Sequence, residues 1–344
     1  MVDAGARQLA VRGASLMAPF IAADVGGTHA RVGLVRPQSS SRLVLERYEQ
    51  YVCAEHADLA SIMRAFLDGL DGVIVQEAAI ACAGYCLDGT IINTNLPWTV
   101  SLERMRAELH LSRIEFVNDF EAVAYATPHL EPGDATLLTR SGAVAAAAPT
   151  VIVGPGTGLG AAVRIPSGHG HVVLATEAGQ SAFAPGSERE IEVLRILRRK
   201  AAHVSIEQVL SGPGLVNLHA ALGELRGSSV QPASPVDIAQ AGLRGSDATA
   251  REALDMFCGL MGSVLGNLVL LYGAQGGAYL AGGILPQIKD HLVASDFLER
   301  FVAKGAMRPV LERVPVWLVE HRQLGVLGAA SWYLQQRADA AVGQ

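Results

Sequence analysis

A glycine-rich turn between two apolar strands constrains the fold of this chain more than any other feature. The turn is Gly26–Thr28; the apolar run Phe20–Ala23 and Asp24 precede it, and the alternating run Arg31–Val35 follows it. Adjacent glycines let backbone N–H groups face a ligand because no Cβ atom blocks its approach. Asp24 places a carboxylate where a hydrated Mg²⁺ would lie. The stretch therefore predicts a phosphate-binding hairpin with a carboxylate on its metal side.

A second unit of the same kind lies further along the chain. The apolar stretch Thr150–Val153 leads into the turn Gly154–Gly160, and strand-like residues Ala161–Ile165 follow until Pro166, where we expect the strand to stop. A dinucleotide-binding fingerprint must open a helix, and a Walker A loop needs Gly-Lys-Ser/Thr, so neither motif fits. A plain tight turn explains either unit alone. The two units together, with Gly282-Gly283 after a third strand, predict duplicated lobes that face each other across a cleft.

Strand and helix alternate through much of the remaining chain, which predicts an α/β fold. We expect further strands at 42–51, 77–83, 114–117, 279–281 and 315–319, and helices at 59–70, from 101, from 120, from 188, from 212, at 247–272 and at 325–335. Ser187 and Glu190 have the spacing of a capping box before one of these helices. At 344 residues the chain is long enough for about two domains.

Composition argues against several classes of protein. Hydrophobic residues make up 50% of the chain and charged residues 17%, so it can bury sizeable cores and is not intrinsically disordered. The formal charge of −6 argues against nucleic-acid binding, which needs a basic face. Apolar stretches are broken by glycine or charge before about 18 residues, so we expect no membrane span. No secretory signal is visible, and we expect residues 1–18 to be a disordered tail.

The cysteines and histidines show no metal-binding pattern. The cysteines form no Cys-x-x-Cys pair, so we expect buried thiols, and their scatter fits a reducing compartment. The histidines have no metal-ligand spacing with cysteine or carboxylate, so each is expected to be a surface or core residue. The residues concerned are Cys53, Cys82, Cys86 and Cys258, and His29, His169, His171 and His203.

Asp119 is the candidate for a catalytic base. It stands at the C-terminal end of a predicted strand, where α/β sheets place their ligands, although it can equally cap the helix that follows. A hydroxyl group that attacks a phosphoryl group needs a carboxylate to accept its proton and to orient its oxygen. The neighbouring Asn118 can hydrogen-bond an adjacent hydroxyl.

Further polar residues suit a substrate with several hydroxyl groups. Glu177 and Gln180 follow the second glycine unit, and Glu207 lies in the segment 203–209. With Asn118 and Asp119 they provide many hydrogen-bond acceptors and few cations, which suits a polyhydroxyl molecule rather than an anion. Each acid also has a plain interpretation, Glu177 as a solvated loop residue and Glu207 as a charge on a helix surface.

The ordered set of motifs resembles bacterial ATP-dependent glucokinase. The motifs are Asp24-Val25-Gly26-Gly27-Thr28, Asn118-Asp119-Phe120, Gly156-Thr157-Gly158-Leu159-Gly160, Leu210-Ser211-Gly212-Pro213-Gly214 and Ala281-Gly282-Gly283. The resemblance covers nearly the whole chain, from about Pro19 to the C-terminal helix. It implies the actin-like ATPase (ribonuclease H-like) fold of hexokinases, with a small lobe at residues 19–130 plus 322–344 and a large lobe at 131–321.

The resemblance also implies the activity and the partners. It implies Mg²⁺ and ATP, glucose or another hexose as acceptor, and transfer to the sugar 6-hydroxyl to give glucose 6-phosphate, the first step of glycolysis. It further implies a cytoplasmic homodimer that binds neither nucleic acid nor a membrane. The cysteine-rich zinc motif of the related repressor–kinase family is absent, so we expect no structural zinc.

The family's functional residues match positions of this sequence. Asp119 matches the catalytic base, and Asp24 matches the Mg²⁺-side aspartate, which acts through water. Sugar ligands are implied at Asn118, Asp119, Glu177, Gln180 and Glu207. ATP-binding residues are implied at Ala23, Asp24, Val25, Gly26, Gly27, Thr28, Gly156, Thr157, Gly158, Gly282 and Gly283.

Two positions depart from the family pattern. Gln180 replaces the usual histidine of Glu-x-Gly-His, so one sugar hydrogen bond changes and discrimination between sugars is expected to suffer. His29 replaces the usual asparagine after Gly-Gly-Thr, which we expect to alter nucleotide contacts mildly. Two alternatives therefore stay open: a kinase for another hexose, and a sugar-binding regulator that has lost catalysis. A pure binder needs no base, and the retention of Asp24 and Asp119 argues against the regulator.

Overall fold

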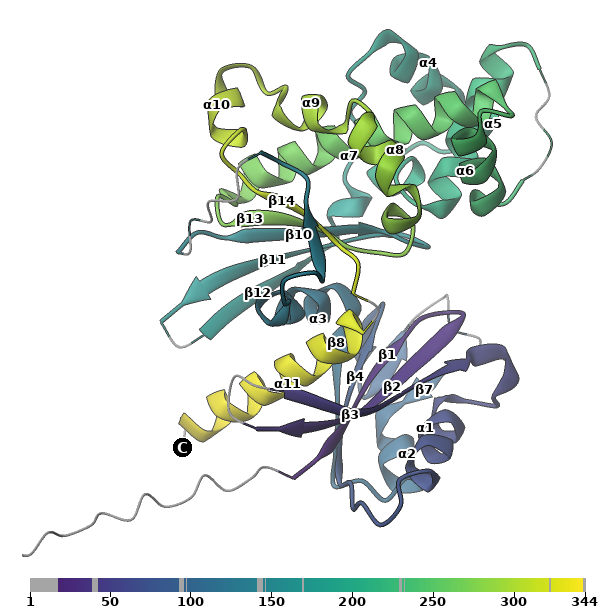
Figure 1. Cartoon of the computed structure of the whole chain (residues 1–344). Coiled ribbons are helices and arrows are strands. Elements are labelled where there is room, and N and C mark those ends of the chain that lie inside the picture. Colours follow the sequence, from purple (N-terminus) through teal and green to yellow (C-terminus); the bar gives the residue numbers. More distant parts are fainter. Residues whose placement is uncertain are drawn as a thin grey trace, which may run out of the picture.

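The computed structural model describes residues 18–38, 43–92, 96, 98–140, 145, 147–168, 170–228, 231, 233–321 and 323–342 (Figure 1). The chain forms a mixed α/β structure around two large sheets. The tail predicted at residues 1–18 lies outside the described residues except for Ala18.

The first sheet has the strand order β3-β2-β1-β4-β8. Its strands are β1 (Phe20–Val25), β2 (His29–Pro37), β3 (Leu43–Val52), β4 (Glu77–Cys82) and β8 (Arg113–Asn118). The hairpin pairs β1–β2 and β2–β3 are antiparallel, whereas β1–β4 and β4–β8 are parallel. A small separate sheet joins β5 (Tyr85–Leu87), β6 (Thr90–Ile92) and β7 (Val100–Ser101).

The second sheet repeats this pattern. Its order is β12-β11-β10-β13-β14-β9, formed by β12 (Gly170–Thr176), β11 (Leu159–Ser167), β10 (Thr150–Pro155), β13 (Gly277–Leu280), β14 (Val316–Val319) and β9 (Ala135–Leu137). The pairs β10–β11 and β11–β12 are antiparallel, and β10–β13 and β13–β14 are parallel. The first five strands therefore have the order and directions of the first sheet, so the duplication that the two glycine turns predict is present in the sheets.

Helices α3 (Asp119–Ala126) and α11 (Leu324–Val342) lie between the two sheets (Figure 1). Apolar residues of α11 such as Val326 and Ala329 pack with Phe20 and Ala22 of the first sheet. The two helices approach so closely that a Cβ atom at Gly328 would lie 1.9 Å from the carbonyl oxygen of Ala122. Helices α1 (Leu59–Asp68) and α2 (Leu102–Glu108) contribute to the cluster on the other face of the first sheet.

The remaining helices pack around the second sheet. They are α4 (Glu188–Leu197), α5 (Gly212–Leu225), α6 (Pro235–Arg244), α7 (Ala248–Tyr272), α8 (Lys289–Ala294), α9 (Phe297–Val302) and α10 (Arg308–Leu311). Short 3₁₀ turns occur at Cys53–Glu55, Thr127–His129, Ala178–Gln180, Ile206–Gln208, Leu285–Ile288 and Gly305–Met307.

Helix α7 corrects the expectation that apolar stretches are too short to span a membrane. By length and composition it could do so, with a mean hydropathy of 1.7 over an 18-residue window. In the structure 72% of that window is buried, and Leu254, Phe257, Met261 and Leu265 belong to the largest core cluster. The apolar character of α7 is therefore explained by its central position in the core.

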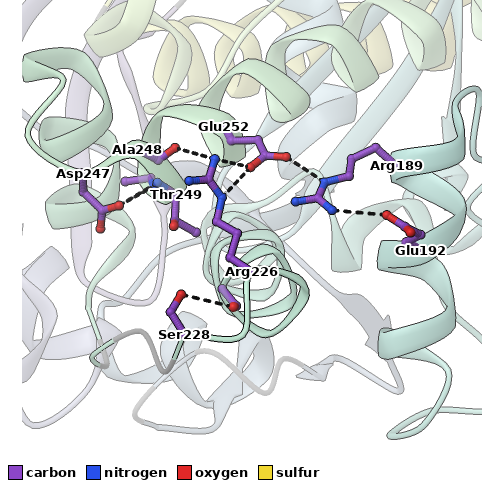
Figure 2. Close-up of polar contacts among 10 residues, drawn as sticks. Arg189, Glu192, Arg226, Ser228, Asp247, Ala248, Thr249 and Glu252 are labelled. Atoms are coloured by element: carbon purple, nitrogen blue, oxygen red, sulfur yellow. Dashed lines mark hydrogen bonds and ion pairs between the residues drawn. The ribbon is translucent and has the colours of Figure 1, made fainter.

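An ion-pair network ties α4, α5 and α7 together (Figure 2). Glu252 on α7 accepts a hydrogen bond from Nε of Arg189 on α4 at 2.8 Å. Its second carboxylate oxygen accepts from Nη2 and Nε of Arg226, the residue after α5, at 2.7 and 3.0 Å. Burial raises the pKa of Glu252, but the two arginines outweigh it, so that the net shift is downward. The network thus favours the ionised glutamate and holds three helices in one arrangement.

Most predicted elements are confirmed, but several features differ from the prediction. Pro166 does not stop its strand, because β11 continues to Ser167 and pairs with β12, an edge strand that was not expected. Ser187 caps α4 through the N–H of Glu190, but the reciprocal half of the capping box is missing, because Glu190 accepts from Gly186 N–H and pairs with Arg300. Strands β5, β6, β7 and β9 and helices α6, α8, α9 and α10 were not predicted, and α11 runs well beyond residue 335.

Candidate active site

The first glycine turn is the tip of the β1–β2 hairpin. The N–H of Gly26 donates to the carbonyl oxygen of His29 at 2.9 Å, which closes the turn. The loop after β3 supports it from outside, because Cys53 N–H donates to the carbonyl oxygen of Thr28 at 2.9 Å. Gly26, Gly27 and Thr28 are exposed, so their backbone can approach a ligand.

The second glycine turn joins β10 to β11 and is tied to its neighbours. Gly156 N–H donates to the carbonyl oxygen of Gly158 at 2.8 Å, and the carbonyl of Gly156 accepts from Gly212 N–H at the start of α5, also at 2.8 Å. The third turn packs directly on this hairpin. Gly282 has φ +95, and a Cβ atom there would lie 2.6 Å from the carbonyl oxygen of Pro155, so glycine is required on both grounds.

Both hairpin turns line one cavity of about 270 Å³. Of the residues singled out in the sequence, this cavity is lined by Asp24, Val25, Gly26, Gly27, Asn118, Asp119, Gly156, Thr157, Gly158, Glu177 and Glu207. They come from β1 and its turn, the junction of β8 and α3, the second hairpin, the residue before one 3₁₀ turn and a residue within another. Residues far apart in the sequence therefore meet around one space between the two sheets.

Asp119 lies at the first residue of α3. The helix cap is Asn118, whose Oδ1 accepts from the N–H groups of Phe120 and Glu121 at 3.0 and 3.2 Å, so the alternative of Asp119 as the cap is corrected. The carboxylate of Asp119 also accepts from Phe120 N–H, at 2.9 Å. Burial and the nearby Asp24 raise the pKa of Asp119 to about 6, although that N–H group opposes the shift. This carboxylate is ionised at neutral pH and suited to proton transfer.

Asp24 is the next-to-last residue of β1, beside the first turn. Arg31 lies directly opposite on β2, and its Nη1 donates to Oδ2 of Asp24 at 3.1 Å. Burial raises the pKa of Asp24, while Arg31 lowers it. The first turn of α11 also approaches, because a Cβ atom at Gly325 would lie 2.4 Å from Cγ of Asp24. Arg31 and the first turn of α11 therefore hold the carboxylate of Asp24 at the cavity.

Glu207 lies against the second glycine turn. Its Oε2 accepts from Leu159 N–H at 2.8 Å, and a Cβ atom at Gly158 would lie 2.5 Å from the same oxygen. Its Oε1 accepts from Nε2 of Gln180 at 3.2 Å. The carbonyl of Gln180 is in turn 2.8 Å from Nε2 of His203. Glu207 lies in a 3₁₀ turn rather than on a helix surface, and the exposed Glu177 precedes another such turn.

The charge of this cavity of about 270 Å³, the smaller of two in the cleft, favours a divalent cation. Its described lining contains the carboxylates of Asp24, Asp119, Glu177 and Glu207 and no lysine, arginine or histidine. Phosphate groups could enter such a site only with a cation that offsets the repulsion. Within the described residues no cluster of three or more His, Cys, Asp or Glu could hold a metal by itself. The donor set therefore fits Mg²⁺, which keeps several waters and shares its ligands with substrate phosphates.

A larger cavity of about 1050 Å³ continues from this site. The two share Asp24, Asp119 and Phe120, and the larger one adds Gly282 and Gly283. The remaining described lining includes Arg31, Tyr48, Gln50, Asp134, Glu320, His321 and Gln323. The third glycine turn therefore faces the same cleft as the other two.

Three predicted residues line neither cavity. Ala23 is fully buried among the apolar residues of the first sheet, so its side chain faces away from the cleft. Thr28 lies at the exposed end of its turn, and Gln180 reaches the site through Glu207.

Sequence reasoning missed three residues that shape the cleft. Arg31 could have been found, because the hairpin turn places it opposite Asp24. Phe120 covers the second hairpin, where a Cβ atom at Gly160 would lie 1.9 Å from its ring. Gly325 makes room for Asp24, and no local pattern signals that contact.

Comparisons with known proteins identify what this arrangement is similar to. The family model described as Glucokinase matches residues 21–336. A glucokinase-like protein of Xylella fastidiosa (strain Temecula1 / ATCC 700964) is 47% identical over 322 residues, or 93% of this chain and 96% of that protein. A glucokinase of Saccharophagus degradans is 38% identical over 92% of this chain and 98% of that protein. A crystal structure of glucokinase from an Antarctic psychrotroph matches with a TM-score of 0.82 and 32% identity, covering 92% and 98%.

Proposed function

Because the chain belongs to the glucokinase family, we propose that it transfers the γ-phosphoryl group of ATP to the 6-hydroxyl of glucose. The single observation that carries this proposal is the smaller cavity, where two glycine turns from different sheets meet beside Asp119. A tight turn alone has many uses. Two such turns beside a proton acceptor and several hydrogen-bonding carboxylates suit phosphoryl transfer to a hydroxyl group.

The fold that we propose is the actin-like ATPase fold of hexokinases. The repeated strand order of the two sheets supports it. We assign residues 19–130 with 322–344 to a small lobe and 131–321 to a large lobe.

ATP is assigned to the continuous cleft formed by both cavities. The backbone of Gly26–Thr28 and Gly156–Gly158 would face its phosphates, and Gly282 and Gly283 its adenosine. Asp24 would hold Mg²⁺ through water, and the bound ion would offset the negative charge of the phosphates. Ala23, Val25 and the rest of β1 would position Asp24 and the first glycine turn. The side chain of Ala23 would not contact ATP.

Asp119 is assigned the role of general base. Its pKa of about 6 leaves it ionised at neutral pH yet able to accept a proton from the attacking hydroxyl. The hydrogen bond from Phe120 N–H orients its carboxylate. Exclusion of water from the cleft would prevent hydrolysis of ATP in place of sugar phosphorylation.

The sugar is assigned to the acidic side of the smaller cavity. Asn118, Glu177 and Glu207 offer acceptors to sugar hydroxyls, and Gln180 acts beside Glu207. Gln180 stands where the family has a histidine, and its hydrogen bond occupies one carboxylate oxygen of Glu207. This contact favours a second candidate, a kinase for another hexose. We also propose that the protein is cytoplasmic and forms a homodimer, as the family resemblance implies.

Turnover by the purified chain tests the proposal. Glucose, mannose and glucosamine are supplied with Mg²⁺ and ATP, and ADP release is coupled to a spectrophotometric assay. Fast turnover of glucose supports glucokinase activity, and a marked preference for another sugar supports the second candidate. Hexose binding by calorimetry without turnover of any of the three sugars would favour a regulator and contradict both.

A further inference from the structure

A cluster of one arginine and two histidines lies outside the cleft and has no carboxylate partner among the described residues. Arg164 projects from β11, and its Nη1 lies 3.3 Å from Nε2 of His171 on β12. Nε of Arg164 and Nδ1 of His171 are buried and have no hydrogen-bond partner among the described residues. Buried arginine is normally paired, because removing its charge from water is costly. The charge of Arg164 and the donor capacity of these two buried nitrogens therefore need an explanation.

Groups from two layers of the molecule meet at this cluster. His129, in the 3₁₀ turn after α3, lies 2.9 Å from Oγ of Ser331 on α11 through its Nε2. Gln335 of α11 donates a hydrogen bond to the carbonyl oxygen of His171 at 2.6 Å. The cluster therefore lies where the second sheet faces the layer formed by α3 and α11 (Figure 1).

The electrostatic neighbours of the cluster are almost all neutral or positive. Burial lowers the pKa of Arg164, and the ionisable neighbour that opposes this shift is the phenol of Tyr279. Burial, Arg164 and His129 each lower the pKa of His171. Burial also lowers the pKa of His129. A negative charge at this position would oppose the downward shift of each of these pKa values.

We propose that Arg164, His171 and His129 form a second ligand site that binds a phosphate-type anion. The guanidinium offers two parallel donors to the oxygens of a phosphate, and the unpartnered Nδ1 of His171 offers a third. Free inorganic phosphate and a phosphorylated sugar share this chemistry. The anion would bridge β11 and β12 to the region around His129 and α11.

This site is distinct from the cleft. Neither cavity of the cleft is lined by Arg164, His171 or His129. Gly160 and Arg164 are on the same strand, four residues apart, which corresponds to about 13 Å of extended chain. A ligand at Arg164 would therefore act on the strand that carries the second glycine turn, at the junction of the two layers.

Calorimetry on the full chain tests the proposal. Inorganic phosphate and glucose 6-phosphate are titrated separately at constant ionic strength, after the protein has been saturated with glucose and a non-hydrolysable Mg²⁺–ATP analogue. Binding of the analogue is measured first, so failure of the proposed kinase function is recognised independently. We expect one phosphate-type anion per chain to bind outside the blocked cleft. Arg164→Gln should weaken it at least tenfold, whereas Arg195→Gln, at an exposed arginine of α4, should not.

The outcomes separate the ligand sources and decide the proposal. Binding of inorganic phosphate as tight as that of glucose 6-phosphate identifies a free anion, and tighter binding of the sugar phosphate identifies the sugar ester. If Arg164→Gln does not fold, His171→Leu replaces it, because it removes the Nδ1 donor while leaving a side chain of comparable size. Failure of the wild-type chain to bind either anion, or unchanged binding in a folded Arg164→Gln or His171→Leu chain, would overturn the proposal.

Discussion

Gln180 donates a hydrogen bond from Nε2 to Oε1 of Glu207 at 3.2 Å. The same glutamate accepts from Leu159 N–H at 2.8 Å, so its two oxygens are divided between the second glycine hairpin and the residue that departs from the family pattern. The contact links the proposed sugar site to the hairpin that we assign to the phosphates of ATP. It also makes Gln180 a residue whose exchange should change sugar binding while leaving the glycine turns in place.

Exchange of Gln180 tests its assignment to sugar recognition. Gln180→His should lower KM for glucose, because the imidazole restores the family's contact. A hydrogen bond gained at this position is worth about 1 kcal/mol, or roughly fivefold in affinity. Steady-state kinetics with glucose measure the effect, and Gln240→His, at an exposed position of α6, serves as control. An unchanged or higher KM would show that Gln180 is not a sugar ligand.

The raised pKa of Asp119 predicts an acid limb in the pH profile. Protonation removes its ability to accept a proton, so kcat/KM for ATP should decline below pH about 6. The decline should approach tenfold per pH unit, as expected for one essential base. Initial rates are measured with Mg²⁺ in excess, which keeps the nucleotide chelated. A profile that stays flat down to pH 4.5 would argue against this base.

Close packing between Gly160 and Phe120 predicts a coupled pair. A Cβ atom at position 160 would lie 1.9 Å from the Phe120 ring, so Gly160→Ala must displace the residue that follows Asp119. We expect a loss of about 1–3 kcal/mol in the free energy of unfolding, as for other overpacked sites. The double variant with Phe120→Leu should recover part of that loss in denaturant titrations. Strictly additive losses would show that the two positions do not interact.

The Glu252 network predicts a pH-dependent contribution to stability. The pKa of Glu252 is lowered in the folded chain, so its stabilisation is present at neutral pH and is lost as the pH falls through the lowered pKa. Glu252→Gln should cost about 1–2 kcal/mol at pH 7, because two arginines lose their partner. The difference from the wild-type chain should shrink in acid. Glu188→Gln, at an exposed residue of α4, should show neither effect in urea titrations.

Local sequence patterns predicted the elements whose signal is contained in one stretch. The two hairpins were predictable because each places glycines between apolar runs, and the long helix α7 because its apolar residues repeat on one face. Strand β12 was missed because it is an edge strand with Val172 and Leu174 exposed, which breaks the usual buried pattern. The choice between Asn118 and Asp119 as helix cap could not be made, since both residue types cap helices well.

The candidate site was predictable only in part, because it depends on contacts distant in sequence. The likeness of ordered motifs selected Asp24, Asp119 and the first two glycine turns, and the structure brings them around one cavity. The contact of Glu207 with Leu159 spans 48 residues and leaves no local trace. The unpaired Arg164 is similar: its isolation from carboxylates depends on how the second sheet meets α11.

The most direct test of the account is kcat of Asp119→Asn, measured with separate affinities for glucose and for the Mg²⁺–ATP analogue. We predict a fall in kcat of about 10²–10⁴ from loss of the general base, with both affinities and the melting temperature close to wild type. Glu121→Gln, in the same first turn of α3, is the matched control and should retain near-normal kcat. Near-normal turnover by a folded Asp119→Asn chain would contradict the assignment of Asp119 and the mechanism built on it.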